Sequence, residues 1–262
     1  MRHTVLSKPR RKGAVVLLVG AVLLGLGASF LGIQAAQDAV YENLASMARS
    51  DRVQGAQSGD SVLSAASAKE DSGLDWDALL AQNASLVAWL SVEGTAIDYP
   101  VVQPADGQDA DYYLHHDFWG AYSTQGCPYL DARASADGMH LLVYGHHLSS
   151  SGQMFTALYR AYQQDVFEGI GTATWETQTG AVEFVPVCSL SVDKAYADIQ
   201  VFSFGSTAEL RAWLAGIAED ASARSNGWTE LCAQATRVLT LVTCSSTIAG
   251  QRARTLVIFA AL

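Results

Sequence analysis

The feature that most constrains this chain is an uncharged apolar segment close to its N-terminus. Residues 13–36 carry no charge, and their most apolar part, Ala14–Ile33, is long enough to cross a membrane as a helix. Five cations and no acidic residue precede it: Arg2, Lys8, Arg10, Arg11 and Lys12. The positive-inside rule therefore predicts a cytoplasmic basic tail over residues 1–12 and a single-pass signal anchor over 13–36. Everything after the anchor is then expected outside the cell membrane.

Two other interpretations of this segment stay open at this level. A cleaved signal peptide is the first, because the small residues Ala35 and Ala36 would permit a cut. A buried core helix is the second, but it would be shorter and would not follow five cations. The length of the apolar stretch favours the uncleaved anchor.

The charge distribution excludes one class of partner. The formal net charge is -10, and the basic tail alone contributes +5, so the rest of the chain carries -15. A body this acidic has no cation-rich surface from which bound nucleic acid would release counterions, so no nucleic-acid partner is expected. The mean hydropathy of +0.14 is high for a soluble protein and agrees with a segment in lipid.

The segment 37–73 is rich in Ser, Ala, Asp, Gln and Gly and has little hydrophobic periodicity after Met47. It predicts an extracytoplasmic stalk, helical in part near the membrane, that holds a folded domain above the bilayer. The domain itself is expected over residues 74–262.

Short strands outnumber helices in this domain. Runs rich in β-branched residues predict strands at 95–103, 140–145, 181–192, 237–243 and 254–262. Expected helices are two short ones divided at Asn83 between Asp75 and Leu90, one opened by a capping box of Ser206 and Glu209, and one at 154–162. Because no regular βαβ alternation occurs, the pattern favours a mainly-β domain, an antiparallel or mixed barrel or sandwich with peripheral helices.

One constellation of residues carries chemistry. Cys244 stands at the C-terminal tip of the apolar run RVLTLVT, and Arg254 opens the last predicted strand. If these strands pair, the guanidinium lies beside the thiol, where it can lower the thiol pKa and hold an oxyanion. His146 and His147 end another strand, and a histidine at the same rim could protonate a leaving amine. Taken singly, the cysteine fits a packing role, the arginine a solvated charge and the histidines a turn.

Five stretches in chain order resemble one family. They are WLSVEGTAIDYPVVQ (89–103), DYYLHHDFWGAYSTQGCPYLD (111–131), VYGHHLSSSGQMFTAL (143–158), LTLVTC (239–244) and ARTLVIFAAL (253–262). The fourth matches the TLxTC signature of sortases, and the set resembles the class B sortases over about residues 74–262. The resemblance implies a sortase-like closed β-barrel of about eight strands, with N-terminal and peripheral short helices.

The resemblance also implies roles for individual residues. Cys244 matches the nucleophile, His146 the general acid/base and Arg254 the cation that stabilises the oxyanion and the substrate. Arg252 is the nearest competitor for that last role but falls outside the strand match, and His147 is expected to fill the turn. Substrate-binding candidates are Tyr196, in a loop expected to contact the peptide, and three residues around the nucleophile, Val242, Thr243 and Ser245. Many class B members carry a small hydroxyl residue where this chain has Val242.

The implied activity is that of a membrane-anchored cysteine transpeptidase. It would cleave a C-terminal sorting signal of secreted proteins through a thioester and transfer the product to an amino group of a lipid-linked peptidoglycan precursor. Alternatives are a pilin-polymerising sortase with a lysine acceptor, a thiol protease of another fold, and a non-catalytic anchored barrel that binds ligands. A thiol protease would need Asn or Asp to orient the histidine, whereas the matched third residue is an arginine.

No cofactor and no metal are expected. The sequence has no cluster of carboxylates, His or Cys with metal-ligand spacing, and class B sortases are not known to require calcium. Outside the cell a structural disulfide could join two of the remaining cysteines, Cys127, Cys188 and Cys232, and the sequence does not choose among them.

Overall fold

Four stretches of the chain are described by the computed structural model: residues 39–49, 73–149, 151–245 and 251–262. Apart from residues 39–42, they belong to one unit, Asn43–Leu262, with its own core. The predicted basic tail and membrane anchor lie outside the described residues, as does most of the predicted stalk. Within the described stretches, no helix has both the length and the hydropathy needed to cross a membrane.

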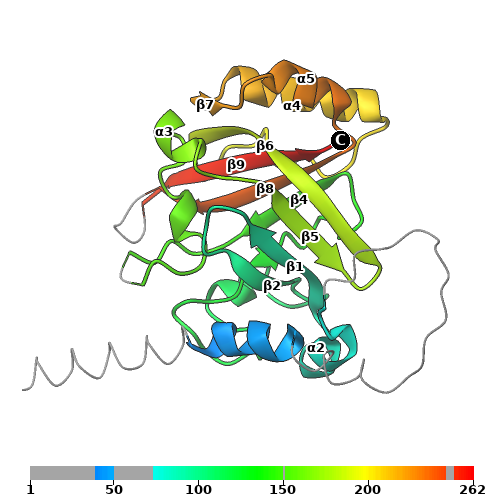
Figure 1. Cartoon of the computed structure of the whole chain (residues 1–262), viewed down its shortest axis with the longest axis vertical. Helices are drawn as coiled ribbons and strands as arrows, with labels where there is room; N and C mark the ends of the chain where they lie inside the picture. Colours follow the sequence, from blue (N-terminus) through cyan, green and yellow to red (C-terminus); the bar gives the residue numbers. More distant parts are fainter. Residues whose placement is uncertain (1–38, 50–72, 150, 246–250) are drawn as a thin grey trace, which may run out of the picture. The chain divides into compact units, whose positions relative to one another are not determined.

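Eight strands close into a barrel (Figure 1). Hydrogen-bonded neighbours follow the order β5-β1-β2-β3-β4-β8-β9-β6, and β6 pairs with β5 to complete the circle. The pairs β2–β3 and β4–β8 are parallel and the other pairs of the circle are antiparallel. The bounds are β1 (Leu86–Val92), β2 (Asp98–Val102), β3 (Tyr129–Leu130), β4 (His140–Tyr144), β5 (Ala173–Thr177), β6 (Gly180–Asp193), β8 (Arg237–Cys244) and β9 (Ala253–Ala261). The predicted mainly-β closed barrel of about eight strands is confirmed.

All five predicted strands exist, as β2, β4, β6, β8 and β9. Strands β3, β5 and β7 (Ala223–Arg224) were not predicted, and β7 pairs with β6 outside the circle. Two of these are only two residues long, too short to form a pattern of their own. The two-residue strands β3 and β7 form because the longer strands β4 and β6 supply their hydrogen bonds.

The prediction of a second helix after Asn83 is wrong. The first helix, α2 (Trp76–Gln82), begins as expected, with the Asp75 carboxylate accepting a hydrogen bond from the Ala78 N–H at 2.9 Å. Asn83 ends it, and its side chain donates to the Phe118 carbonyl oxygen at 2.6 Å. The next residues form β1, which lies between β2 and β5. Its apolar side chains are buried on both faces, and such a run imitates helical spacing.

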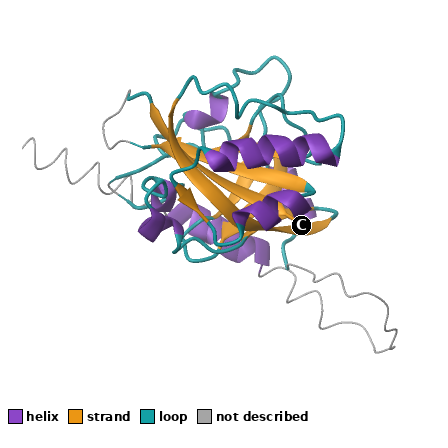
Figure 2. Ribbon diagram, turned by 90° about the horizontal axis from the view of Figure 1, so that it is seen from above, coloured by secondary structure: helices purple, strands orange, loops and turns teal. Residues whose placement is uncertain are grey.

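Helices α4 (Thr207–Glu219) and α5 (Trp228–Gln234) pack together on one side of the strands (Figures 1 and 2). The predicted cap of α4 is confirmed, since the Ser206 hydroxyl accepts from the Glu209 N–H at 3.2 Å. Leu210, Leu214 and Ile217 of α4 share one buried cluster with residues of β4, β6, β8 and β9. These strands therefore have one face toward the barrel interior and one toward the helices.

The helix expected over 154–162 is reduced to a single 3₁₀ turn, η2 (Thr156–Leu158). Met154 has a φ of 55°, a left-handed conformation that cannot start a right-handed helix. Its N–H donates to the Tyr99 hydroxyl at 3.2 Å, a tertiary contact that no local pattern reveals. Two further short elements complete the fold, η1 (Tyr112–Leu114) and α3 (Gln164–Phe167).

Candidate active site

Cys244 and Arg254 lie opposite each other on neighbouring strands. The register of β8 and β9 pairs Cys244 with Arg254, and the register of β6 and β9 pairs Arg254 with Val192. Directly opposed residues project from the same face of a sheet, so all three side chains share one surface. Cys244 is half-buried, and the Arg254 Nη1 donates to the carbonyl oxygens of Gln251 at 2.8 Å and Ala253 at 3.0 Å.

His146 reaches the same end of the barrel because β4 runs parallel to β8. Tyr144 is in register with Val242, and the Gly145 N–H donates to the Val242 carbonyl oxygen at 3.0 Å. Two strands that run parallel deliver the residues after their ends to one rim. His146 therefore follows β4 at the rim where Cys244 ends β8.

The surroundings of His146 determine which ring nitrogen carries a proton and whether the ring is charged. Its Nε2 lies 2.7 Å from the carbonyl oxygen of Leu114, and because a carbonyl only accepts, Nε2 carries a proton. Burial lowers the pKa of His146 below its ordinary value, and the neighbouring His115 and Arg254 lower it further, while the hydrogen bond to Leu114 opposes them. The imidazole is therefore neutral at neutral pH, with Nδ1 as the nitrogen that gains the second proton.

A pocket of about 540 Å³ joins these groups. Cys244, His146 and Arg254 all line it, as do three of the four predicted substrate-binding residues, Tyr196, Val242 and Thr243. The fourth, Ser245, is not among the lining residues, and its hydroxyl lies 2.9 Å from that of Thr255. The pocket is thus built from five adjacent strands, the connection that follows β6 and the stretch around η1.

The loop expected to contact the peptide, residues 193–199, does contribute to the lining. Several other lining residues were not predicted, namely Leu114, His115, Tyr129, Tyr144, Val192, Gln200 and Leu256. Val192, Tyr144 and Leu256 share the face of Cys244 through strand register alone. A known register and the alternation of side chains would have found them, but register is not readable from one sequence. Leu114 and His115 come from the stretch around η1, far away in the chain.

His147 also borders the pocket but is held in the turn. Its ring stacks on the Tyr159 ring with centroids 4.2 Å apart, and its backbone bridges to Met154. Gly145, next to the catalytic candidate His146, touches the Phe155 ring so closely that an added Cβ would lie 2.6 Å from ring carbons. The turn that carries the two histidines is therefore packed against residues 154 and 155, which follow it in the chain.

All four cysteines lie in the described part of the chain and are thiols. Cys127, Cys188 and Cys232 are buried, and burial raises the pKa of Cys188 far above its ordinary value. The buried thiols behave as small apolar side chains, in contrast to half-buried Cys244 in the pocket.

His140, at the start of β4, forms a hydrogen bond with the connection between β6 and α4. Because this histidine is buried, we expect the stability of the protein to depend on pH. Its Nδ1 lies 2.7 Å from the Val201 carbonyl oxygen and its Nε2 lies 2.9 Å from the Thr240 hydroxyl. Burial lowers the pKa of His140 to about 4, although the hydrogen bond to Val201 opposes the change. Between pH 6.5 and pH 4 the histidine is protonated in the unfolded chain and neutral in the folded protein. The free energy of unfolding therefore falls on acidification toward pH 4.

The expected loss attributable to His140 between pH 7 and pH 4.5 is about 2 kcal/mol. Urea unfolding at the two pH values measures it, with His140→Gln as the control. The variant is less stable at pH 7 but should lose about 2 kcal/mol less on acidification. An equal loss in both proteins would contradict the assignment.

The sequence of this chain is similar to those of two known proteins. No protein-family model matches the chain. The chain is 27% identical over 168 residues to a protein named Sortase B of Listeria monocytogenes, and 30% identical over 88 residues to Sortase B of Staphylococcus aureus. The first match covers 63% of this chain and 64% of the relative, and the second covers 33% and 34%. The chain therefore aligns with less than two thirds of each relative's length.

Solved structures agree with the sequence matches. Clostridium perfringens sortase B is 25% identical, with a TM-score of 0.61 and coverage of 71% of this chain and 98% of that chain. A Staphylococcus aureus sortase B–substrate complex gives a TM-score of 0.67 at 19% identity, covering 87% and 97%. A sortase B complexed with triglycine gives 0.67 at 19% identity, covering 87% and 98%. The resemblance to class B sortases is therefore confirmed, in the sequence of about 63% of the chain and in the closed eight-stranded fold.

Proposed function

We propose that this protein is a membrane-anchored cysteine transpeptidase of the class B sortase type. The observation that carries the proposal is the meeting of Cys244, Arg254 and His146 in one pocket. The consecutive strands β8 and β9 supply the first two, and the turn after β4, about a hundred residues earlier in the chain, supplies His146. A thiol, a guanidinium and an imidazole with an available second protonation site are the groups that acyl transfer through a thioester needs.

The first half-reaction follows from these positions. Neutral His146 accepts the thiol proton of Cys244 on Nδ1 and becomes an imidazolium. The Cys244 thiolate attacks the carbonyl carbon of a peptide bond, and the carbonyl oxygen becomes an oxyanion. Arg254, paired opposite Cys244 on β9, stabilises that oxyanion together with backbone N–H groups. The C–N bond then breaks as the proton on Nδ1 of the His146 imidazolium passes to the departing amine. A thioester on Cys244 and a free amine remain.

The second half-reaction reverses the proton movement. An incoming amine attacks the thioester carbonyl, and neutral His146 accepts the proton that the amine loses. The Cys244 thiolate leaves and takes that proton back from His146. A new amide has then replaced the cleaved one, and the thiol and the neutral imidazole are restored. The hydrogen bond from Nε2 to the Leu114 carbonyl keeps the same nitrogen, Nδ1, available in both halves.

The substrate classes proposed are a C-terminal sorting signal of secreted proteins and an amino group of a lipid-linked peptidoglycan precursor. Two similar structures support this pairing, one described as a sortase B–substrate complex and one as sortase B with triglycine. The predicted anchor over residues 13–36 would hold the domain at the outer membrane face, where both substrates are tethered.

Mass spectrometry of the purified protein, incubated with a panel of candidate sorting peptides, tests the proposal. We expect an acyl adduct on Cys244 with at least one peptide, and its loss on addition of triglycine. An adduct that only a lysine-bearing protein removes would instead indicate a pilin-polymerising enzyme. No adduct with any peptide, while small reagents still alkylate Cys244, would contradict transpeptidation.

The two neighbouring histidines are expected to differ in their effect on turnover. His146→Ala should lower kcat by about 10²–10⁴-fold, the usual contribution of a positioned acid/base, because the departing amine loses the imidazole proposed to protonate it. His147→Ala should matter far less, since its ring stacks on Tyr159 within the turn. Steady-state kinetics of peptide cleavage compares the two variants. A larger loss in His147→Ala would mean that the wrong histidine has been chosen.

A further inference from the structure

The connection between β6 and α4, residues 194–206, forms one wall of the pocket without regular secondary structure. It supplies Tyr196, Ile199 and Gln200 to the lining. Its backbone forms turns, including a bond from the Gln200 N–H to the Ala197 carbonyl oxygen at 2.8 Å. A segment of this kind is fixed over a pocket by its contacts with the rest of the fold.

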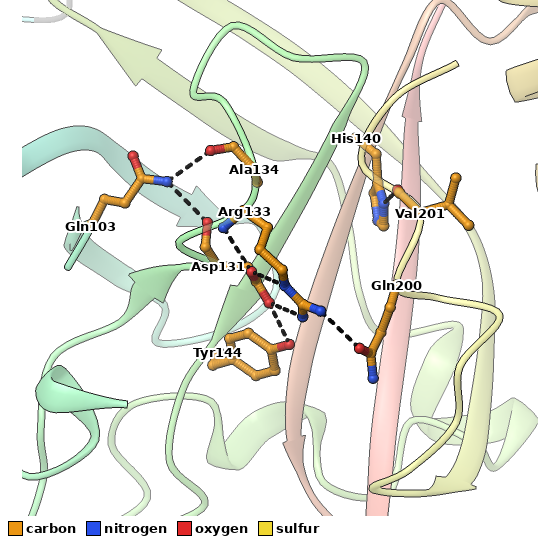
Figure 3. A network of polar contacts seen from close by, with 8 residues as sticks. All are labelled: Gln103, Asp131, Arg133, Ala134, His140, Tyr144, Gln200 and Val201. Atoms are coloured by element: carbon orange, nitrogen blue, oxygen red, sulfur yellow. Dashed lines mark hydrogen bonds and ion pairs between the residues drawn. The ribbon is translucent and has the colours of Figure 1, made fainter. Parts of the chain in front are cut away.

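Arg133 contacts this connection from the barrel side. Its Nη1 donates to the Gln200 side-chain oxygen at 3.0 Å, as Figure 3 shows. Its guanidinium also lies over the Phe202 ring, 4.6 Å from the centroid. One side chain thus contacts two residues of the wall, although Arg133 itself is not among the residues that line the pocket.

Asp131 fixes the direction of that guanidinium. Its two carboxylate oxygens accept from the Arg133 Nε at 2.9 Å and Nη2 at 2.8 Å, a bidentate pair. The Asp131 side chain is only 8% exposed. Burial raises the pKa of Asp131, but hydrogen bonds from Arg133 and Tyr144 outweigh it and hold the pKa below its ordinary value. The bidentate pair with this ionised, buried carboxylate holds the Arg133 guanidinium in one orientation. In that orientation Nη1 donates its hydrogen bond to Gln200.

The same carboxylate also reaches the pocket through β4. The Tyr144 hydroxyl donates to Asp131 at 3.0 Å, and the Tyr144 ring stacks on the Tyr129 ring, with centroids 5.2 Å apart. Gln103 donates to the carbonyl oxygens of Asp131 at 2.9 Å and Ala134 at 2.8 Å, which fixes the turn that carries the network (Figure 3). The network therefore joins the tyrosine pair of the lining to the 194–206 connection.

We propose that Arg133, oriented by Asp131, is a positioning residue for peptide binding: through Gln200 it sets the place of the pocket wall formed by residues 194–206. The inference rests on the proposed function, because the wall is assigned to the substrate peptide. Cys244 lies on β8, Arg254 lies on β9, and His146 follows β4. None of them belongs to the 194–206 connection, so they stay in place when the wall moves. Loss of the tether acts on binding and leaves the chemical step unchanged.

Arg133→Gln tests this prediction against a matched control. We expect the KM of the peptide that acylates Cys244 to rise about tenfold, the size expected for a lost charge-assisted hydrogen bond, with kcat within about twofold of wild type. Arg49→Gln removes another bidentate arginine–aspartate pair, to Asp98, with a similarly exposed arginine. Its residues do not line the pocket, so its KM should equal that of wild type. A fall in kcat at constant KM in Arg133→Gln, or an equal rise in KM in Arg49→Gln, would overturn the proposal.

A double-mutant cycle identifies the route of the effect. Gln200→Met removes the acceptor of Arg133 while keeping the length of the side chain. If Arg133 acts through Gln200, Arg133→Gln has no further effect once Gln200 is replaced, and the double variant has the KM of the single Gln200 variant. Effects that multiply would mean that Arg133 acts by another route and would overturn the assignment.

Hydrogen exchange without substrate separates this proposal from the proposed function. Amides of residues 195–205 should exchange at least about threefold faster in Arg133→Gln than in wild type, and at the wild-type rate in Arg49→Gln. Unchanged exchange in Arg133→Gln would refute the tether, even in an active enzyme. Faster exchange in a protein that no peptide acylates would uphold the tether and refute transpeptidation.

Discussion

Replacing Cys244 by alanine is expected to abolish acyl transfer and to leave the barrel folded. The Cys244 side chain is half-buried at the end of β8, and no disulfide depends on it. Alanine keeps the backbone ladder to Arg254 and removes only the sulfur, so without a nucleophile no thioester forms. Loss of the peptide adduct in mass spectrometry, with an unchanged thermal unfolding midpoint, is the expected result.

A second cysteine provides the control for this experiment. Cys232 is buried in the cluster between α5 and the strands, so Cys232→Ala should keep the adduct and lose about 1 kcal/mol of stability. The two variants should therefore show opposite combinations of activity and stability. Cargo transfer by Cys244→Ala, or its unfolding, would contradict the assignment of Cys244 as a nucleophile at a structurally tolerant position.

Replacing Arg254 by lysine is expected to cost roughly 2–4 kcal/mol of transition-state stabilisation, the scale of one oxyanion donor. Lysine keeps the positive charge, so a site that needs only a cation would lose little. Arginine instead offers a planar fork, and the bonds from Nη1 to the Gln251 and Ala253 carbonyl oxygens fix that fork in place. The loss should appear mainly in kcat, because the interaction strengthens as negative charge develops on the substrate oxygen.

Arg252 is the matched control for Arg254. Its guanidinium forms a bidentate pair with Asp193, with bonds of 2.7 and 2.6 Å, and it does not line the pocket. Arg252→Ala should therefore change kcat much less than Arg254→Lys does. Near-normal turnover in Arg254→Lys together with a collapse in Arg252→Ala would mean that Arg252 is the cation of the reaction.

Local patterns were sufficient where the determining contacts are local. The caps at Asp75 and Ser206 depend on residues three positions away, and both form as the sequence predicts. The long strands β8 and β9 are continuous apolar runs, and the segment between them is short enough to make their pairing the simplest arrangement. That pairing places Cys244 opposite Arg254, so the core of the candidate site was accessible from sequence.

Local patterns failed where distant residues decide. The helical spacing after Asn83 belongs to β1, because β2 and β5 supply hydrogen bonds along both of its edges. The helix expected after Met154 is interrupted by a bond to Tyr99, 55 residues earlier. In each case a tertiary contact outweighs a local preference of a few tenths of a kcal/mol per residue.

Local patterns along the chain were enough to predict the mainly-β class, the apolar segment with its basic flank, and the thiol, imidazole and guanidinium of the candidate site. How the barrel closes, and which side chains surround those three groups, became known from the folded arrangement of the strands. Val192 and Tyr144 enter the pocket through strand register, and Gln200 is held by Arg133 from 67 residues away. Side-chain periodicity can be recognised along the chain, whereas strand register and the contact between Arg133 and Gln200 depend on hydrogen bonds between segments that meet only after folding.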